Sequence, residues 1–171
     1  MGIYQQALGD DFKQLGEALQ RFHSGSNSSV GMLTVTHNPH PVSKFFVWLM
    51  QLPKAGTHLE THLSVVQHDC EEVWTRKIGE TRLVTRQRVK NGKLIESAGP
   101  LTFEFDLSQS GGAMLFHSYR SRILGVPLPK HIAPFIEADA TPNETGWLVD
   151  VRIKCPRYGC ICRYEGNVII E

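Results

Sequence analysis

Apolar and polar residues alternate through residues 71–107, and turn signals divide this stretch into four short segments. Asn91-Gly92 is the strongest of these signals, because a two-residue type I′ turn needs positive φ at both central residues. Gly79-Glu80 and Gly99-Pro100 mark the other two turns. We therefore predict four strands that fold back on one another as an antiparallel meander.

The predicted turns determine which residues lie opposite one another, and side chains alternate between the two faces of a strand. One face should be the core, with Trp74, Ile78, Leu83, Val89, Leu94, Leu101, Phe103, Phe105 and Leu107. The other face should be exposed to solvent, with Lys77, Arg82, Arg86, Arg88, Lys90 and Lys93.

A polar row crosses the apolar face of the meander. The register places Gln87 opposite both Glu72 and Glu96, with Trp74 and Arg76 on the same side. Burying a charge is unfavourable unless the charge is paired or hydrated. The row therefore predicts a solvated cavity or an ion-pair network, unless the register is wrong.

Similar alternation predicts strands in other parts of the chain. These are residues 30–36, 57–68, 113–122, 136–140, 147–153 and 160–170. In the second of them, an Asp69-Cys70 turn places Val65 opposite Trp74, so the apolar face of the meander continues onto this strand.

Helical spacing occurs mainly at the amino-terminal end. An amphipathic helix is predicted there from the three- and four-residue steps between Tyr4, Leu8, Phe12, Leu15, Leu19 and Phe22. A short helix capped by Ser43 should end at Pro53 and serve either as a core helix or as a lid over a barrel end. A further short helix is predicted at residues 129–135.

Together these elements predict a mainly β (α+β) fold. Seven or eight consecutive antiparallel strands with short turns favour a curled antiparallel sheet or an up-and-down β-barrel of about eight strands, with an N-terminal amphipathic helix and one or two short helices. The 171 residues contain no repeat and no long linker, so we expect a single domain spanning residues 1–171.

Composition and charge narrow the choice of partners. A formal net charge of +1 gives no electrostatic reason to expect nucleic acid or an anionic membrane surface. No apolar run is long enough for a transmembrane segment, and no secretory signal is recognised, so a cytoplasmic location is expected. His58-x-Glu60-x-His62 has metal-ligand spacing but falls on the outer face, and we predict neither a metal site nor a cofactor.

Several motifs together resemble a known family. They are Leu8-Gly9, Phe22-His23, Leu52-Pro53, Trp74-x-Arg76, Glu96-x-x-Gly99-Pro100, Leu-Gly-Val-Pro-Leu-Pro at 124–129, Pro-Arg-Tyr-Gly at 156–159 and Tyr164-x-Gly166. The chain resembles the family called domain of unknown function 4166 over nearly its whole length. Members of that family occur free or joined to a saccharopine-dehydrogenase-like reductase, so the resemblance implies a small-molecule or lipid-related setting and a candidate reductase partner. This chain lacks a GxGxxG motif, so the reductase chemistry is not carried over.

A barrel of about eight strands can hold one small ligand. We predict a non-catalytic barrel that binds a small hydrophobic or amphiphilic molecule. The ligand-binding residues are predicted to be Trp74, Phe103 and Phe105 as the wall, with Arg76, Gln87 and Glu96 orienting a polar head. The alternative is a filled interior in which Arg76 pairs with an acidic neighbour.

Two other classes of function stay open at this point. An enzyme of the hydrolase type would use Glu72 and Glu96 as acid and base, since two strand spacings place their backbones roughly 10 Å apart. A docking module for a reductase would use the proline-containing apolar loop at residues 124–129, which loses little entropy on binding.

Overall fold

The computed structural model describes residues 2–171, which fold into eleven strands and four short helical segments. The helical segments are α1 (Ile3–Leu8), the 3-10 helix η1 (Gly9–Gln14), α2 (Glu17–Phe22) and α3 (Pro41–Leu49). The strands are β1 (Asn27–His37), β2 (Gly56–His68), β3 (Glu71–Ile78), β4 (Thr81–Lys90), β5 (Lys93–Ala98), β6 (Leu101–Ser110), β7 (Ala113–Ile123), β8 (Val126–Pro127), β9 (Phe135–Pro142), β10 (Gly146–Cys155) and β11 (Gly159–Ile170).

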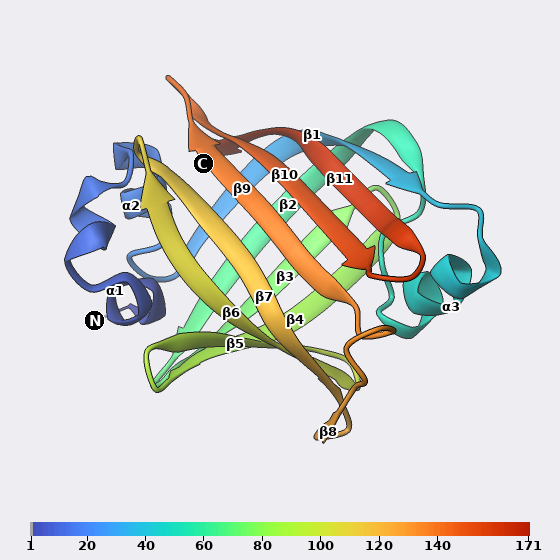
Figure 1. The fold of residues 1–171 in the computed structure, drawn as a ribbon. Coiled ribbons are helices and arrows are strands. Elements are labelled where there is room, and N and C mark those ends of the chain that lie inside the picture. Colours follow the sequence, from blue (N-terminus) through green and yellow to red (C-terminus); the bar gives the residue numbers. More distant parts are fainter. Residues whose placement is uncertain (1) are drawn as a thin grey trace.

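Ten of the strands close into an antiparallel barrel (Figure 1). Strands β1 to β7 follow one another around the ring, β9 to β11 continue it, and β11 pairs with β1 to complete it. The two-residue strand β8 pairs only with the end of β7. The expected count of about eight strands was too low, because all ten strands that the alternation predicted, four in the meander and six elsewhere, join the same ring.

The register of the meander is confirmed. Asn91 and Gly92 have φ values of 53° and 72°, as a type I′ turn requires. Gln87 lies opposite Glu72 on one side and opposite Glu96 on the other. The inward and outward faces of β3 to β6 are therefore those that the turns predicted.

The amino-terminal stretch forms three short pieces instead of the single amphipathic helix that was predicted. Gly9 has a φ of 59°, which ends α1, and Gly16 separates η1 from α2. The six apolar residues used for that prediction are nevertheless all buried. These side chains belong to the core, and Figure 1 shows the segment at one end of the barrel, on the left-hand side.

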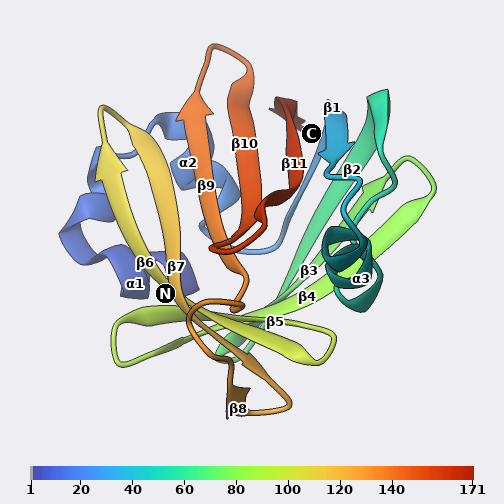
Figure 2. The ribbon, with the colours of Figure 1, turned by 45° about the vertical axis from the view of Figure 1, so that its right-hand side comes forward.

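The helix α3 lies at the opposite end of the barrel (Figures 1 and 2). Ser43 lies inside α3 and does not cap it; the cap is His40, whose Nδ1 accepts from the N–H of Val42, and Pro41 occupies the first turn, where its fixed φ fits. The segment at 129–135 forms a turn, not the predicted helix. No helix within residues 2–171 has the length and apolar character needed to cross a membrane.

Glycines allow the backbone of β11 to approach its neighbours closely. A Cβ atom added to Gly31 would lie 2.3 Å from the carbonyl oxygen of Asn167, and one added to Gly146 would lie 1.9 Å from that of Val168. These contacts lie where β11 joins β1 and β10. Closure of the ring therefore depends on residues without a side chain.

We predict that Gly31→Ala lowers the free energy of unfolding by about 1–3 kcal/mol, because the new methyl group meets backbone that cannot move without disturbing the β1–β11 pairing. Gly25→Ala is the control, since its Cβ would meet only the side-chain oxygen of Gln67 at 3.7 Å. Urea denaturation of both variants checks this. Equal stability of the two variants would contradict the account of closure.

Candidate functional site

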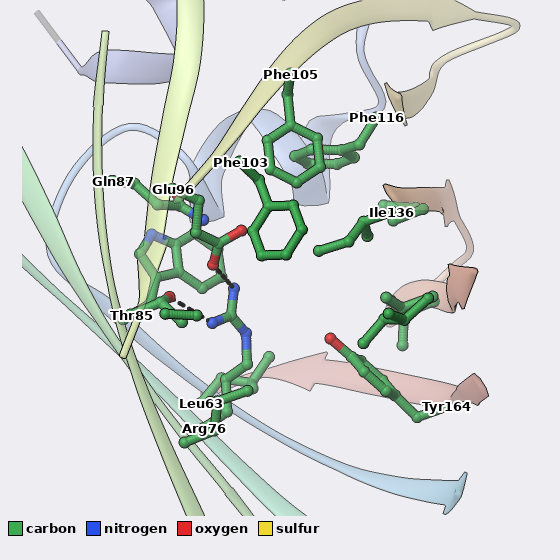
Figure 3. Close-up of a pocket in the computed structure, with 18 of the residues that line it drawn as sticks. Leu63, Arg76, Thr85, Gln87, Glu96, Phe103, Phe105, Phe116, Ile136 and Tyr164 are labelled. Carbon is green, nitrogen blue, oxygen red and sulfur yellow. Dashed lines mark hydrogen bonds and ion pairs between the residues drawn. The ribbon is translucent and has the colours of Figure 1, made fainter. Parts of the chain in front are cut away.

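A cavity of about 130 Å³ lies inside the barrel. All six residues predicted from the sequence line it: Trp74, Arg76, Gln87, Glu96, Phe103 and Phe105. Figure 3 shows Arg76 and Glu96 on one side of the space, with Phe103, Phe116 and Ile136 around it. The register predicted that the six residues would lie together, and this is confirmed. That they bind a ligand stays a prediction.

An ion pair between Arg76 and Glu96 forms the charged part of the cavity. Nη2 of Arg76 on β3 lies 3.2 Å from Oε1 of Glu96 on β5, and Nη1 donates to Oγ1 of Thr85 on β4 at 2.7 Å. The guanidinium carbon also lies 4.9 Å from the centre of the Trp74 ring. Arg76 thus reaches across β4 and connects three strands from within the barrel.

Both members of this pair keep contact with the cavity. Each side chain is 14% exposed, although both residues face the interior. Inward-facing apolar residues of the opposite wall, Phe116 and Ile136, are also only partly buried. The open surface of these side chains therefore belongs to the space that Figure 3 shows between them.

The end of the cavity under α1 and α2 is aromatic and uncharged. The hydroxyl of Tyr4 donates to Oε1 of Gln87 at 2.6 Å, and the rings of Tyr4 and His23 lie 4.1 Å apart. Burial lowers the pKa of His23 to about 3, and the nearby Arg76 acts in the same direction. Burial, together with Glu72 and Glu96, raises the pKa of Tyr4 well above its ordinary value. Both side chains are therefore neutral near pH 7.

The wall formed by β11 contributes Tyr164. Burial raises the pKa of its hydroxyl to about 12, with Arg76 opposing the shift and Glu96 adding to it. Its ring faces the interior because Tyr164 lies opposite the buried residues Val35 and Val151. Figure 3 shows the hydroxyl pointing into the cavity.

Glu72 does not share the cavity with Glu96. It is 1% exposed, and its Oε2 accepts from Nε1 of Trp74 at 3.1 Å. Burial raises its pKa, while hydrogen bonds from Trp74 and the Ile3 backbone oppose the shift. The row of Glu72, Gln87 and Glu96 exists, but only one of its carboxylates borders space that a substrate could enter, so the geometry does not favour a paired-carboxylate hydrolase.

The sequence motif with metal-ligand spacing lies on the outer surface of the barrel. His58, Glu60 and His62 are exposed on the outer face of β2, with His62 lying 3.2 Å from Glu60. Within residues 2–171 no group of three or more His, Cys, Asp and Glu side chains is arranged to hold a metal ion.

Sequence reasoning missed part of the cavity lining. The residues it did not assign to the site include Tyr4, His23, Leu63, Thr85, Phe116, Ile136 and Tyr164. Thr85 could have been found, since the predicted register already placed it opposite Trp74 on the inner face. Tyr4, His23 and Tyr164 come from other parts of the fold, and only the closed barrel brings them to β3 and β5.

The model of one protein family matches most of the chain. It is described as a domain of unknown function (DUF4166), and it covers residues 15–168. The chain belongs to this family. Neither a curated protein nor a solved structure matches the chain.

The motifs that carried the resemblance to DUF4166 contribute directly to the cavity. Trp74 and Arg76, Glu96, His23 and Tyr164 all line it and lie within the matched residues. Tyr4, on α1, lines the cavity from outside the matched range. The DUF4166 part of the chain therefore supplies the ion pair and most of the wall by itself.

We predict that Glu72→Gln stabilises the protein at pH 8 and not at pH 4. A raised pKa means that the folded state disfavours the ionised form, so wild-type stability falls as pH rises through the ordinary value of 4.5 and up to the raised one. Glutamine keeps an oxygen for Trp74 and removes the charge. Chemical denaturation across this pH range measures the difference.

Glu71→Gln is the matched control for this experiment, because Glu71 is the partly exposed neighbour of Glu72 and pairs with Arg86. A Glu72→Gln effect that is the same at both pH values, or that equals the effect of Glu71→Gln, would contradict the buried position of Glu72.

We also predict that Arg76→Met lowers the free energy of unfolding by about 3 kcal/mol, because it leaves Glu96 unpaired in the interior. The double variant Arg76→Met/Glu96→Leu should recover most of this loss, since it removes both charges. Lys54→Met, which breaks an exposed pair with Glu80, should change stability by less than about 1 kcal/mol. Glu96→Leu alone completes the comparison, and a loss in the double variant equal to the sum of the losses in Arg76→Met and Glu96→Leu would show that the pair is not coupled.

Proposed function

We propose that this barrel binds a small hydrophobic or amphiphilic molecule in its cavity. The observation that carries the proposal is the incomplete burial of Arg76 and Glu96, which face the interior and still keep 14% of their side-chain surface open. A barrel that served only as a packed scaffold would gain by sealing such a pair or by replacing it with apolar residues.

The distribution of polar and apolar groups supports an amphiphilic ligand. Aromatic and aliphatic side chains form most of the lining, and the polar atoms lie together near Arg76, Glu96, Thr85 and Tyr164. Binding sites for small molecules are mostly apolar, with a few polar groups that set the orientation of the ligand. Phe103, Phe105 and Trp74 would hold the apolar part, and Arg76, Gln87 and Glu96 would receive the polar part.

The size of the cavity limits the ligand. An engineered cavity of about 150 Å³ accommodates benzene. A volume of about 130 Å³ therefore suits a molecule of about one ring, or a short aliphatic chain, better than a whole membrane lipid.

The remaining sequence predictions on partners and location stay predictions. The loop at residues 124–129 exposes Leu124 (82%) and Val126 (63%), and its docking role toward a reductase stays a prediction from the sequence. A cytoplasmic location likewise rests on the sequence alone.

The proposal is tested by filling the cavity. Ala138 on β9 lines it and lies between Phe116 and Val151 of the neighbouring strands, so we expect Ala138→Phe to occupy the space and to weaken binding of toluene at least tenfold. Leu148→Phe is the control, because Leu148 is 52% exposed on the outer face of β10.

Binding can be followed by tryptophan fluorescence in a Trp48→Phe background. Trp48 is 72% exposed, whereas Trp74 and Trp147 line the cavity, so this change removes the signal from solvent-exposed indole. Native mass spectrometry of the purified protein would show any molecule that remains bound. Failure of both toluene and benzyl alcohol to alter the emission, or equal binding by the Ala138→Phe and Leu148→Phe proteins, would overturn the proposal.

A further inference from the structure

The charges that border the cavity sum to zero. Among residues 2–171, the charged side chains that line the cavity and point into it are those of Arg76 and Glu96. Asp139 also borders the cavity, but its neighbours Ala138 and Ala140 take the inward positions, and its carboxylate pairs with Arg152 on the outer face. His23, Tyr4 and Tyr164 are neutral for the reasons given above.

A charged ligand would therefore enter without a counterion. The carboxylate of an anion would approach Arg76 only by lying next to Glu96, because the two side chains are 3.2 Å apart. A cation at Glu96 would likewise lie next to Arg76. Transfer of an uncompensated charge into a protein interior is unfavourable by several kcal/mol.

The site nevertheless keeps capacity for hydrogen bonds. Arg76 has five N–H groups, and within the described chain its side chain donates to Thr85 and Glu96. Oε2 of Glu96 accepts no hydrogen bond from residues 2–171, and the Tyr164 hydroxyl forms none with them. A ligand group placed here meets donors from Arg76, an acceptor on Glu96, and a hydroxyl that can act as either.

We infer that the cavity selects ligands whose polar group is uncharged, such as an alcohol or a carbonyl compound with about one ring, and discriminates against carboxylates and ammonium ions. The inference rests on the proposed function, since it describes the chemistry of the same cavity. A hydroxyl group can donate to Glu96 and accept from Arg76 or Tyr164, so it matches the neutral pair without disturbing it.

Four molecules of nearly equal size test this inference at pH 7.5: toluene, benzyl alcohol, benzoate and benzylammonium. Isothermal titration calorimetry and the fluorescence of the Trp48→Phe protein give the affinities. Benzyl alcohol should bind at least tenfold more tightly than either ion. It should also bind more tightly than toluene by about twofold to tenfold, the effect of one net hydrogen bond.

Glu96→Gln changes the expected order. It removes the negative charge and leaves Arg76 without its counterion, so benzoate should gain at least tenfold in affinity and bind more tightly than benzyl alcohol. Glu165→Gln makes the same charge change at a partly exposed residue that pairs with Arg163 and is not part of the cavity lining, and it should leave the order unchanged.

The outcomes separate the two proposals. Binding of toluene together with equal or tighter binding of benzoate to the wild-type protein would overturn the selectivity and leave the binding function intact. Failure of all four molecules to bind would overturn both. The wild-type series decides the matter even if Glu96→Gln proves unstable, and circular dichroism shows whether that variant is folded.

Discussion

The ion pair between Arg76 and Glu96 places two charges within an otherwise largely apolar barrel. Arg76 reaches from β3 past Thr85 on β4 to Glu96 on β5, so its position depends on the register of three adjacent strands. A shift of one residue in β3 or β5 would turn a charge outward and an apolar side chain into water, and the same shift in β4 would remove Thr85 from Arg76. The ion pair can therefore form only when the strands of the meander have their correct register.

Both ends of the barrel contribute residues to the lining of the cavity. At one end, α1 and α2 bring Tyr4 and His23 against Trp74, and at the other end Met50 and Leu52 follow α3 into the lining. The ion pair lies between them, bordered by aromatic side chains. Polar groups concentrated at one place in an apolar space can set the orientation of a bound molecule, and this arrangement is the physical basis of the proposed function.

Much of this arrangement follows from short-range sequence signals. The turn at Gly79-Glu80 determined the pairing of β3 with β4, and the turn at Asn91-Gly92 determined the pairing of β4 with β5. These pairings in turn determined which side of the sheet Arg76 and Glu96 occupy. The six predicted site residues lie on β3 to β6, the part of the chain where such turns follow one another at short intervals.

Other features depended on interactions between distant residues. Closure of the ring depends on the pairing of β1 with β11, whose residues lie more than a hundred positions apart in the sequence. The amino-terminal stretch kept the apolar spacing of a helix, yet Gly9 and Gly16 allow it to bend over the end of the barrel, where packing decides its course. Tyr164 and His23 reach the cavity only after closure, so no local pattern could assign them to it.

A crystal structure of the purified protein, at a resolution that places individual solvent molecules, tests the central claim most directly. The account predicts electron density between Arg76, Glu96 and Tyr164, from water or from a bound small molecule, with both charged side chains directed into the barrel. A collapsed interior without space between these residues, or an Arg76 side chain directed to the outer surface, would contradict it.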